Sequence, residues 1–117
     1  MTWALTTAEK TSYSTRGYLL RESVFSQSQV AAVNEVIDHV ETSIVNAAKS
    51  GREYWIEDRR FIDYGAHTLQ FEPAPMDAHL RVLEPVHSLA HELFELISDD
   101  RILDPVRDLI GCEGLSA

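Results

Sequence analysis

Apolar residues recur at alternating steps of three and four along the first half of the chain, the spacing of one helix face. The stretch follows two serines, Ser26 and Ser28, either of which can cap a helix start, and Gly51 stands where a helix end is expected. The apolar positions are Val30, Val33, Ile37, Val40, Ile44 and Ala48. The pattern predicts a long amphipathic helix. In a monomer we expect its apolar face to be exposed, at Val33, Ile37, Val40 and Ile44.

A shorter helix is predicted before this one. Thr6 and Glu9 have the spacing of a capping box, which satisfies two backbone donors at a helix start. Gly17 is a plausible end, because glycine readily adopts the left-handed conformation of a helix terminus. The apolar run 18–20 then predicts a short strand between the two helices.

The middle of the chain is predicted to be extended. Residues 54–56 and 61–62 are rich in strand-forming side chains, and residues 68–72 alternate polar and apolar. Pro73 and Pro75 are expected to end this region, because proline lacks a backbone donor. So few strands do not make a self-sufficient sheet, since isolated strand pairs are marginal in water.

The last third of the chain is predicted to be helical. One helix is expected from residue 76 or 77 to about residue 98, with a kink at Pro85. Asp99 and Asp100 then open a last short helix, with Pro105 in its first turn and Gly111 and Gly114 marking its end. The predicted fold class is α+β, mainly helical with a few strands.

Length and charge narrow the possible functions. A chain of 117 residues suits one domain. Ten Lys and Arg residues against 19 Asp and Glu give a net charge of −9, which disfavours nucleic acid and anionic membranes as partners. No apolar run reaches the roughly 18–20 residues of a membrane span. The single cysteine, Cys112, cannot form an internal disulfide, which fits a reducing, cytoplasmic location.

Two of the five histidines have a spacing seen in metal sites. His87 and His91 are four residues apart in the predicted third helix, and Glu95 lies four residues further on. This spacing places both rings on one helix face, as in zinc proteases, but Ser88 to Ala90 lack the catalytic glutamate of that motif. A polar helix face explains the pair more simply, and a metal site at these three residues is the alternative.

The other candidate groups do not assemble an active site. His39 and Glu41 are two apart in the long helix and point to different sides. His67 and His79 could each line a pocket. Cys112 is followed by a glutamate, which raises a thiol pKa and opposes nucleophilic activation. We therefore expect no catalytic or cofactor-binding residue from these patterns.

Two segments together carry a resemblance to a known family. Residues 16–25, RGYLLRESVF, resemble the opening of the phytanoyl-CoA dioxygenase family, where a short helix leads into such a run before a long amphipathic helix. Residues 98–111, SDDRILDPVRDLIG, resemble the segment that precedes the catalytic core in that family. The resemblance spans about residues 5–115.

The resemblance implies a fold and an activity for a complete family member. Members are Fe(II)- and 2-oxoglutarate-dependent dioxygenases on a double-stranded β-helix, with an H-x-D pair and a distal histidine as iron ligands. Those ligands lie downstream of the matched segment, and none of the five histidines matches them. The resemblance therefore implies that residues 1–117 are a single, incomplete domain. Its helices would brace the β-helix of an oxygenase that hydroxylates a small organic or CoA-linked substrate. Residues 1–117 alone would be inactive.

Two alternatives remain open at this point. The chain can be a helical protein–protein interaction module or homo-oligomer that uses an exposed apolar helix face. It can also be a metal-dependent protein that uses His87, His91 and Glu95. In neither case does the sequence identify a substrate.

Overall fold

The computed structural model describes residues 3–111, which begin with a capped helix, α1 (Thr7–Arg16). Thr6 Oγ1 accepts the Glu9 N–H at 3.2 Å, and Glu9 Oε2 accepts the Thr6 N–H at 2.8 Å. At the other end Gly17 is left-handed, with φ +81°, and its N–H donates to the Tyr13 carbonyl. Both predicted ends of the first helix are confirmed.

The long amphipathic helix is α2 (Gln27–Ala47), continued by a 3-10 turn, η1 (Ala48–Ser50). Ser26 rather than Ser28 is its N-cap, and Gln29 completes a second capping box. Gly51 follows the 3-10 turn and donates its N–H to the Ala48 carbonyl. The predicted long helix is confirmed.

A four-stranded antiparallel sheet follows, in chain order: β1 (Arg52–Ile56), β2 (Arg59–Tyr64), β3 (His67–Phe71) and β4 (Leu80–Glu84). Two-residue turns join the first three strands, so these pair as successive hairpins. The strands predicted at residues 54–56, 61–62 and 68–72 are confirmed to within a residue or two.

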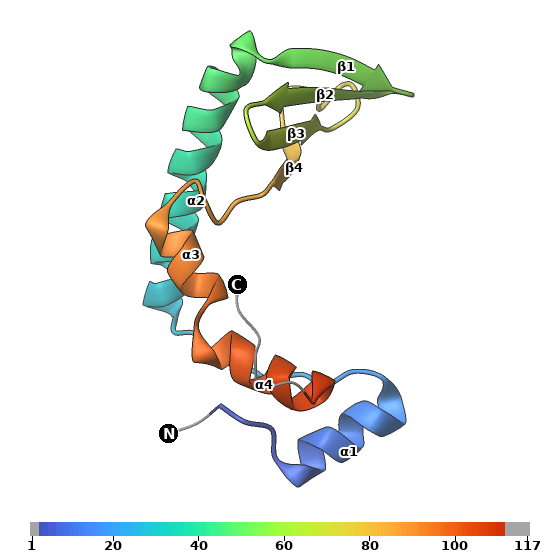
Figure 1. Cartoon of the computed structure of the whole chain (residues 1–117), viewed down its shortest axis with the longest axis vertical. Coiled ribbons are helices and arrows are strands. Elements are labelled where there is room, and N and C mark those ends of the chain that lie inside the picture. The colour runs from blue at the N-terminus through green and yellow to red at the C-terminus, as the bar shows by residue number, and fades with distance from the viewer. Residues whose placement is uncertain (1–2, 112–117) are drawn as a thin grey trace.

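The core lies where the C-terminal end of α2 crosses one face of this sheet (Figure 1). Leu69 and Phe71 of β3 are the largest fully buried side chains, and Ile62 is beside them. Ile44 and Ala48 pack onto this cluster from the helix side. The sheet therefore gains from α2 the second layer that an isolated meander lacks.

The prediction of one helix over residues 76–98 is wrong. This stretch contains a turn-rich loop, β4, a second turn and a short helix, α3 (His91–Ile97). Pro85 removes a backbone donor and disfavours the helical conformation at Glu84. Leu80 and Leu83 instead pack against the core from β4, which pairs with β3. Long-range strand pairing overrides the helical spacing of the apolar residues.

The last helix is α4 (Asp100–Ile110), with Asp99 as its N-cap and left-handed Gly111 as its C-cap. The predicted start and the end at Gly111 are confirmed, and Gly114, the other residue expected to mark the end, lies outside the described residues. The prediction that Pro105 lies in the first turn is wrong. Pro105 lies further along, inside the helix. The polar cap at Asp99 sets the start of the helix, so the position of the proline does not decide it.

The strand predicted at residues 18–20 is also wrong. The segment joins α1 to α2 without regular secondary structure, and its backbone makes no hydrogen bond to other described residues. Its side chains still alternate in exposure: Tyr18 and Leu20 are exposed, at 62% and 78%, while Leu19 is half-buried. The period-two pattern is present, but the described chain offers it no partner strand.

The elements form an open arc rather than a ball (Figure 1). The sheet and the pair α1/α4 project to the same side from a back made by α2 and α3. The radius of gyration is 17.9 Å, whereas a compact chain of this length has about 13 Å. The accessible surface is 8305 Å², against about 6,400 Å² for a compact monomer of 13.2 kDa. The arc therefore leaves surface uncovered that a compact domain buries.

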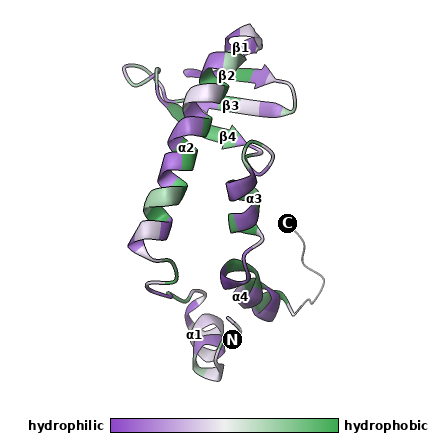
Figure 2. Cartoon of the chain, turned by 90° about the vertical axis from the view of Figure 1, so that its left-hand side faces the viewer, coloured by the Kyte–Doolittle hydropathy of each residue, from purple (hydrophilic) through white to green (hydrophobic). Residues whose placement is uncertain are grey.

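The expectation for the apolar face of α2 is only partly met. Val40 and Ile44 are buried, contrary to prediction, because α3, β4 and the sheet cover this half of the helix. Ile37 is 44% exposed and Val30 is 48% exposed, while Val33 is half-buried. Figure 2 shows apolar segments along α2 and in α4.

The fold is α+β, and no helix within residues 3–111 combines the length and hydrophobicity needed to cross a bilayer.

Candidate functional site

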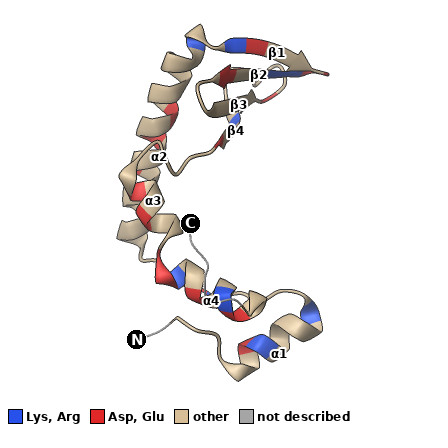
Figure 3. Ribbon diagram, viewed as in Figure 1, with Lys and Arg blue, Asp and Glu red and all other residues tan. Residues whose placement is uncertain are grey.

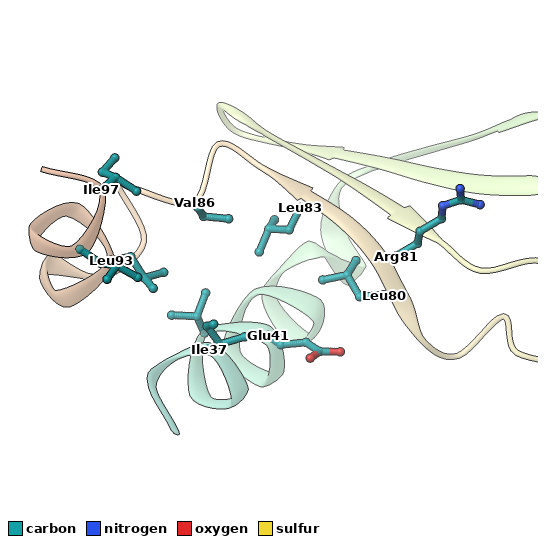
Figure 4. Close-up of a pocket in the computed structure, with 10 residues that line it drawn as sticks. Ile37, Glu41, Leu80, Arg81, Leu83, Val86, Leu93 and Ile97 are labelled. Carbon is teal, nitrogen blue, oxygen red and sulfur yellow. The ribbon is translucent and has the colours of Figure 1, made fainter. Parts of the chain in front are cut away.

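A mainly apolar hollow of about 350 Å³ lies between α2, β4 and α3 (Figure 4). Ile37 and Leu93 approach one another across it from the two helices, and Leu83 closes it from the strand. Its remaining lining residues are Val40, Glu41, Leu80, Arg81, Val86, Leu96 and Ile97. We call this hollow the α2–β4–α3 groove.

The lining of this groove decides what it can do. Only Glu41 and Arg81 are charged, and the side chain of Arg81 points away from Ile37 and Leu93 (Figure 4). The Arg81 guanidinium lies 4.0 Å from a carboxylate oxygen of Glu72. No histidine, cysteine, serine or tyrosine lines the groove, and Glu41 is its one carboxylate. This mostly apolar lining is suited to binding apolar surface.

A smaller apolar hollow of about 160 Å³ continues along α2 toward its N-terminus. Phe25 forms part of its wall, and the Arg101 guanidinium stacks 4.4 Å from that ring. Arg101 donates two hydrogen bonds to Asp99, at 2.8 and 2.7 Å, which lower the pKa of Asp99 to about 2. This charged pair fixes the start of α4 against the loop that precedes α2.

Arg21 organises the junction between α1 and the N-terminal segment that precedes it. Its guanidinium donates to both carboxylate oxygens of Glu9, at 2.9 and 2.7 Å, and to the carbonyls of Trp3 and Ala4. The hydrogen bonds from Arg21, and then the bond from the Thr6 backbone, lower the pKa of Glu9 to about 2. A sequence signal for this pair was absent, because the two residues are twelve apart and belong to different elements.

Two carboxylates of α4 bind the N-terminal segment, residues 3–5, whose carbonyls Arg21 also contacts. Asp104 accepts the Trp3 N–H at 3.0 Å, and Asp108 accepts the Leu5 N–H at 2.6 Å. The two aspartates are one helical turn apart and so reach alternate residues of an extended segment. Together with Arg21 they attach α1 to α4 and shape the lower arm of the arc.

The face of the sheet opposite α2 carries one polar cluster around Asp63. Its carboxylate accepts hydrogen bonds from Arg52 at 2.8 Å, Tyr54 at 3.1 Å and Thr68 at 3.0 Å. The Arg52 bond is the main reason that the pKa of Asp63 is lowered. Burial, and then the bond to Asp63, raise the pKa of Tyr54. The cluster ties β1, β2 and β3 together.

The structure separates the residues predicted as an alternative metal site. His91 begins α3 and its Nε2 lies 3.1 Å from Glu95 Oε1, so these two are paired on one helix face. His87 lies in the turn before the helix, so the premise that both histidines share one helix is wrong. Within residues 3–111, no three His, Cys, Asp or Glu side chains are grouped so that they could hold a metal ion.

The remaining candidates take local structural roles or fall outside the description. His39 and Glu41 lie within α2, as expected. His67 Nδ1 is 2.9 Å from the Pro85 carbonyl, across the β3–β4 side of the sheet. His79 ends the loop before β4, where its backbone bonds to Glu72 and Met76. Cys112 lies outside the described residues.

The strand residues of the groove were missed by the sequence reasoning. Leu80 and Leu83 were assigned to a helix because residues 82–96 include apolar side chains at helical spacing. The available signal was the set of prolines at 73, 75 and 85, which bracket a segment that contains Leu80, Val82 and Leu83. That signal indicates a strand, although its partner could not be read from the sequence.

The comparisons with known proteins add no relative: no family model, no curated protein and no solved structure matches the chain. The candidate site is therefore defined by its geometry alone. It is an apolar concave surface along α2, made of the α2–β4–α3 groove and the smaller hollow beside Phe25.

Proposed function

We propose that this chain is the N-terminal bracing segment of an Fe(II)- and 2-oxoglutarate-dependent oxygenase resembling the phytanoyl-CoA dioxygenase family. In this proposal its helices cover the double-stranded β-helix of the parent enzyme. The parent hydroxylates a small organic or CoA-linked substrate. The segment itself supplies shape and stability, not catalytic groups.

The observation that carries the proposal is the uncovered surface of the arc. The accessible area exceeds that of a compact monomer by roughly 1,000–2,000 Å², comparable to one partner's share of a large permanent interface. Large apolar side chains are among the exposed ones, including Leu20, Val30 and Ile37. An adjoining β-structure on the open side of the arc accounts for both features.

The exposed segment between α1 and α2 supports the same proposal. Its alternating exposure, with Tyr18 and Leu20 outward, is the pattern of a strand with an apolar outer face. Arg21 fixes this segment to Glu9 and to the carbonyls of Trp3 and Ala4. A neighbouring sheet can therefore pair with a backbone that is already held in place.

Iron does not fit the residues of this segment, which lack a suitable group of three ligand side chains within residues 3–111. The proposal therefore assigns iron and 2-oxoglutarate to the parent enzyme and no step of the reaction to this chain. Any contribution of the segment to turnover acts through the stability of the assembled enzyme.

Turnover by the natural protein tests the proposal. The protein is isolated from its source with an antibody against this chain and assayed for succinate formed from 2-oxoglutarate with Fe(II) and oxygen. We expect succinate formation by the natural protein and none by the 117-residue chain alone. Absence of 2-oxoglutarate turnover in an intact, iron-loaded natural protein, across a panel of small organic and CoA-linked substrates, contradicts the proposal.

A matched pair of substitutions tests the bracing role separately. Leu20→Asp is expected to change the stability of the isolated chain by no more than about 0.5 kcal/mol, because the side chain is 78% exposed. In the parent enzyme the same change buries a charge and lowers the melting temperature by several degrees. Ala66→Asp, at an exposed turn position, is the control expected to change neither.

The uncovered apolar surface also favours a second candidate, an interaction module that docks a separate protein. The two readings differ in whether the covering structure belongs to the same polypeptide. The mass of the natural protein separates them.

A further inference from the structure

The first strand of the sheet has an unprotected edge. β1 is at the rim of the sheet and pairs only with β2, so its other side is open (Figure 1). It has no register shift against β2 and no proline, two of the features that blunt an edge strand, and its two charged residues, Arg52 and Glu53, are at its start. Trp55 and Ile56 are each 56% exposed on it. An exposed, regular, partly apolar edge is suited to pairing with another strand.

The hairpin geometry fixes which backbone groups are available. A two-residue turn, Glu57–Asp58, joins β1 to β2, and its closing pair is Ile56 with Arg59. Residues of an antiparallel pair alternate between hydrogen-bonded and non-hydrogen-bonded positions, starting from the closing pair. The N–H and C=O groups of Glu53 and Trp55 therefore point to the free edge.

These two residues are symmetric about Tyr54. We propose that β1 pairs antiparallel with β1 of a second copy of this chain, about a two-fold axis at Tyr54, to form a continuous eight-stranded sheet. In this register Glu53 faces the partner's Trp55 and exchanges both backbone hydrogen bonds with it, and the symmetry repeats the pair. The proposal concerns the outer rim of the sheet and is independent of the oxygenase function.

Charge complementarity supports a second copy as the occupant. The register that centres on Tyr54 places the partner's Glu57 and Asp58 beside residues 49–52. Arg52 there is 76% exposed in its side chain although it is paired with Asp63, and Lys49 is exposed three residues before the strand begins. Figure 3 shows the basic and acidic segments along this hairpin. Each copy thus presents an acidic turn to a basic segment of the other, twice.

Aromatic side chains support the same register. Tyr54 stacks on Phe61 of β2, with ring centroids 5.3 Å apart, on the sheet face opposite α2. At the two-fold axis Tyr54 faces the partner's Tyr54 as a non-hydrogen-bonded pair, in which side chains approach most closely. The stack then continues from one copy into the next.

The other edge of the sheet is less suited to such pairing. The register between β3 and β4 shifts at Gln70 and Phe71, and Pro85 follows β4 directly. Leu80 and Leu83 of β4 also face the core and the α2–β4–α3 groove within the same chain. Bulges and prolines are features that protect an edge from pairing.

Sedimentation equilibrium of the full 117-residue chain over a thousandfold range of concentration tests the proposal. We expect a concentration-dependent rise from 13.2 kDa toward twice that mass. Trp55→Glu sets like charges opposite the partner's Glu53 and is expected to weaken the dimer at least tenfold. Adding Glu53→Lys to that variant restores opposite charges and is expected to recover the dimer.

Leu20→Glu is the matched control, because it adds the same charge at the most exposed apolar residue outside the sheet. It is expected to leave the dimer unchanged. Hydrogen exchange of the wild-type chain provides a readout that needs no variant: the amides of Glu53 and Trp55 should exchange more slowly as concentration rises. A monomer at every concentration, or a dimer that Leu20→Glu breaks and Trp55→Glu does not, overturns the proposal.

Discussion

Replacing Gly51 by alanine should weaken the joint between α2 and the sheet. Gly51 lies between the 3-10 turn and β1, in an extended conformation that any residue can adopt. The hydrogen atom that a side chain would replace faces the packed joint. A Cβ there would lie 2.6 Å from the Asp63 carbonyl oxygen, 2.8 Å from Ile62 Cγ2 and 3.0 Å from the Ala48 carbonyl oxygen. Two of the three atoms are backbone, so the strand or the turn must move.

The size of the effect follows from overpacking. Inserting one methyl group into a well-packed core typically costs about 1–3 kcal/mol. The contact with Ile62 transmits any shift to the core cluster, so we expect a value in the upper half of that range. For a chain of this size the melting temperature should fall by roughly 5–15 °C.

Gly65→Ala is the matched control. Gly65 has φ +58°, and an added Cβ has open space around it, so only the left-handed conformation is penalised, by about 1 kcal/mol. Urea denaturation at neutral pH measures both variants. If Gly51→Ala destabilises the chain no more than Gly65→Ala does, the inferred close packing at the joint is wrong.

Two further predictions concern the Glu9–Arg21 pair and the buried core. The pKa of Glu9 is lowered from 4.5 to about 2, so its pair with Arg21 stabilises the fold above pH 4.5, and this contribution is lost as pH falls toward 2. Glu9→Gln should therefore show a smaller loss of stability between pH 7 and pH 3 in urea titrations, and an equal loss in both proteins contradicts the assignment. Leu69→Ala should cost about 2–5 kcal/mol because Leu69 is fully buried, whereas Leu20→Ala should stay within about 0.5 kcal/mol. Equal denaturation midpoints for these two variants would show that the core is misplaced.

The elements with local signals could be predicted from the sequence. The capping box at Thr6 is encoded within four residues, and α1 starts where this motif predicts. For α2 the sequence analysis leaves the cap open between Ser26 and Ser28, and the structure uses Ser26. The hairpins of β1 to β3 depend on short turns between strand-forming runs, which are also local. Such elements need no knowledge of distant residues.

The groove could not be predicted, because it depends on contacts between distant segments. Val82, Val86 and Leu89 have a helical spacing, yet β4 forms because β3 offers a free edge and Leu83 pairs with Leu69. Whether residues 80–84 are strand or helix is decided by that pairing. The same holds for the pair of Arg21 with Glu9, since neither residue has a motif that points to the other.

The segment from Tyr18 to Leu20 has a strand-like sequence pattern but, unlike β4, does not form a strand. Its alternating pattern indicates a strand, and the described chain contains no strand beside it. A strand requires both a suitable sequence and a partner, and only the first is encoded locally. The bracing proposal supplies the partner from the rest of the enzyme.

The central claim is that the open side of the arc is covered by further structure of the same polypeptide. The most direct test is the intact mass of the natural protein, isolated under denaturing conditions with protease inhibitors. The account predicts one chain of roughly two to three times 13.2 kDa that contains these 117 residues. A natural chain of 13.2 kDa would contradict it and leave the interaction module as the better explanation.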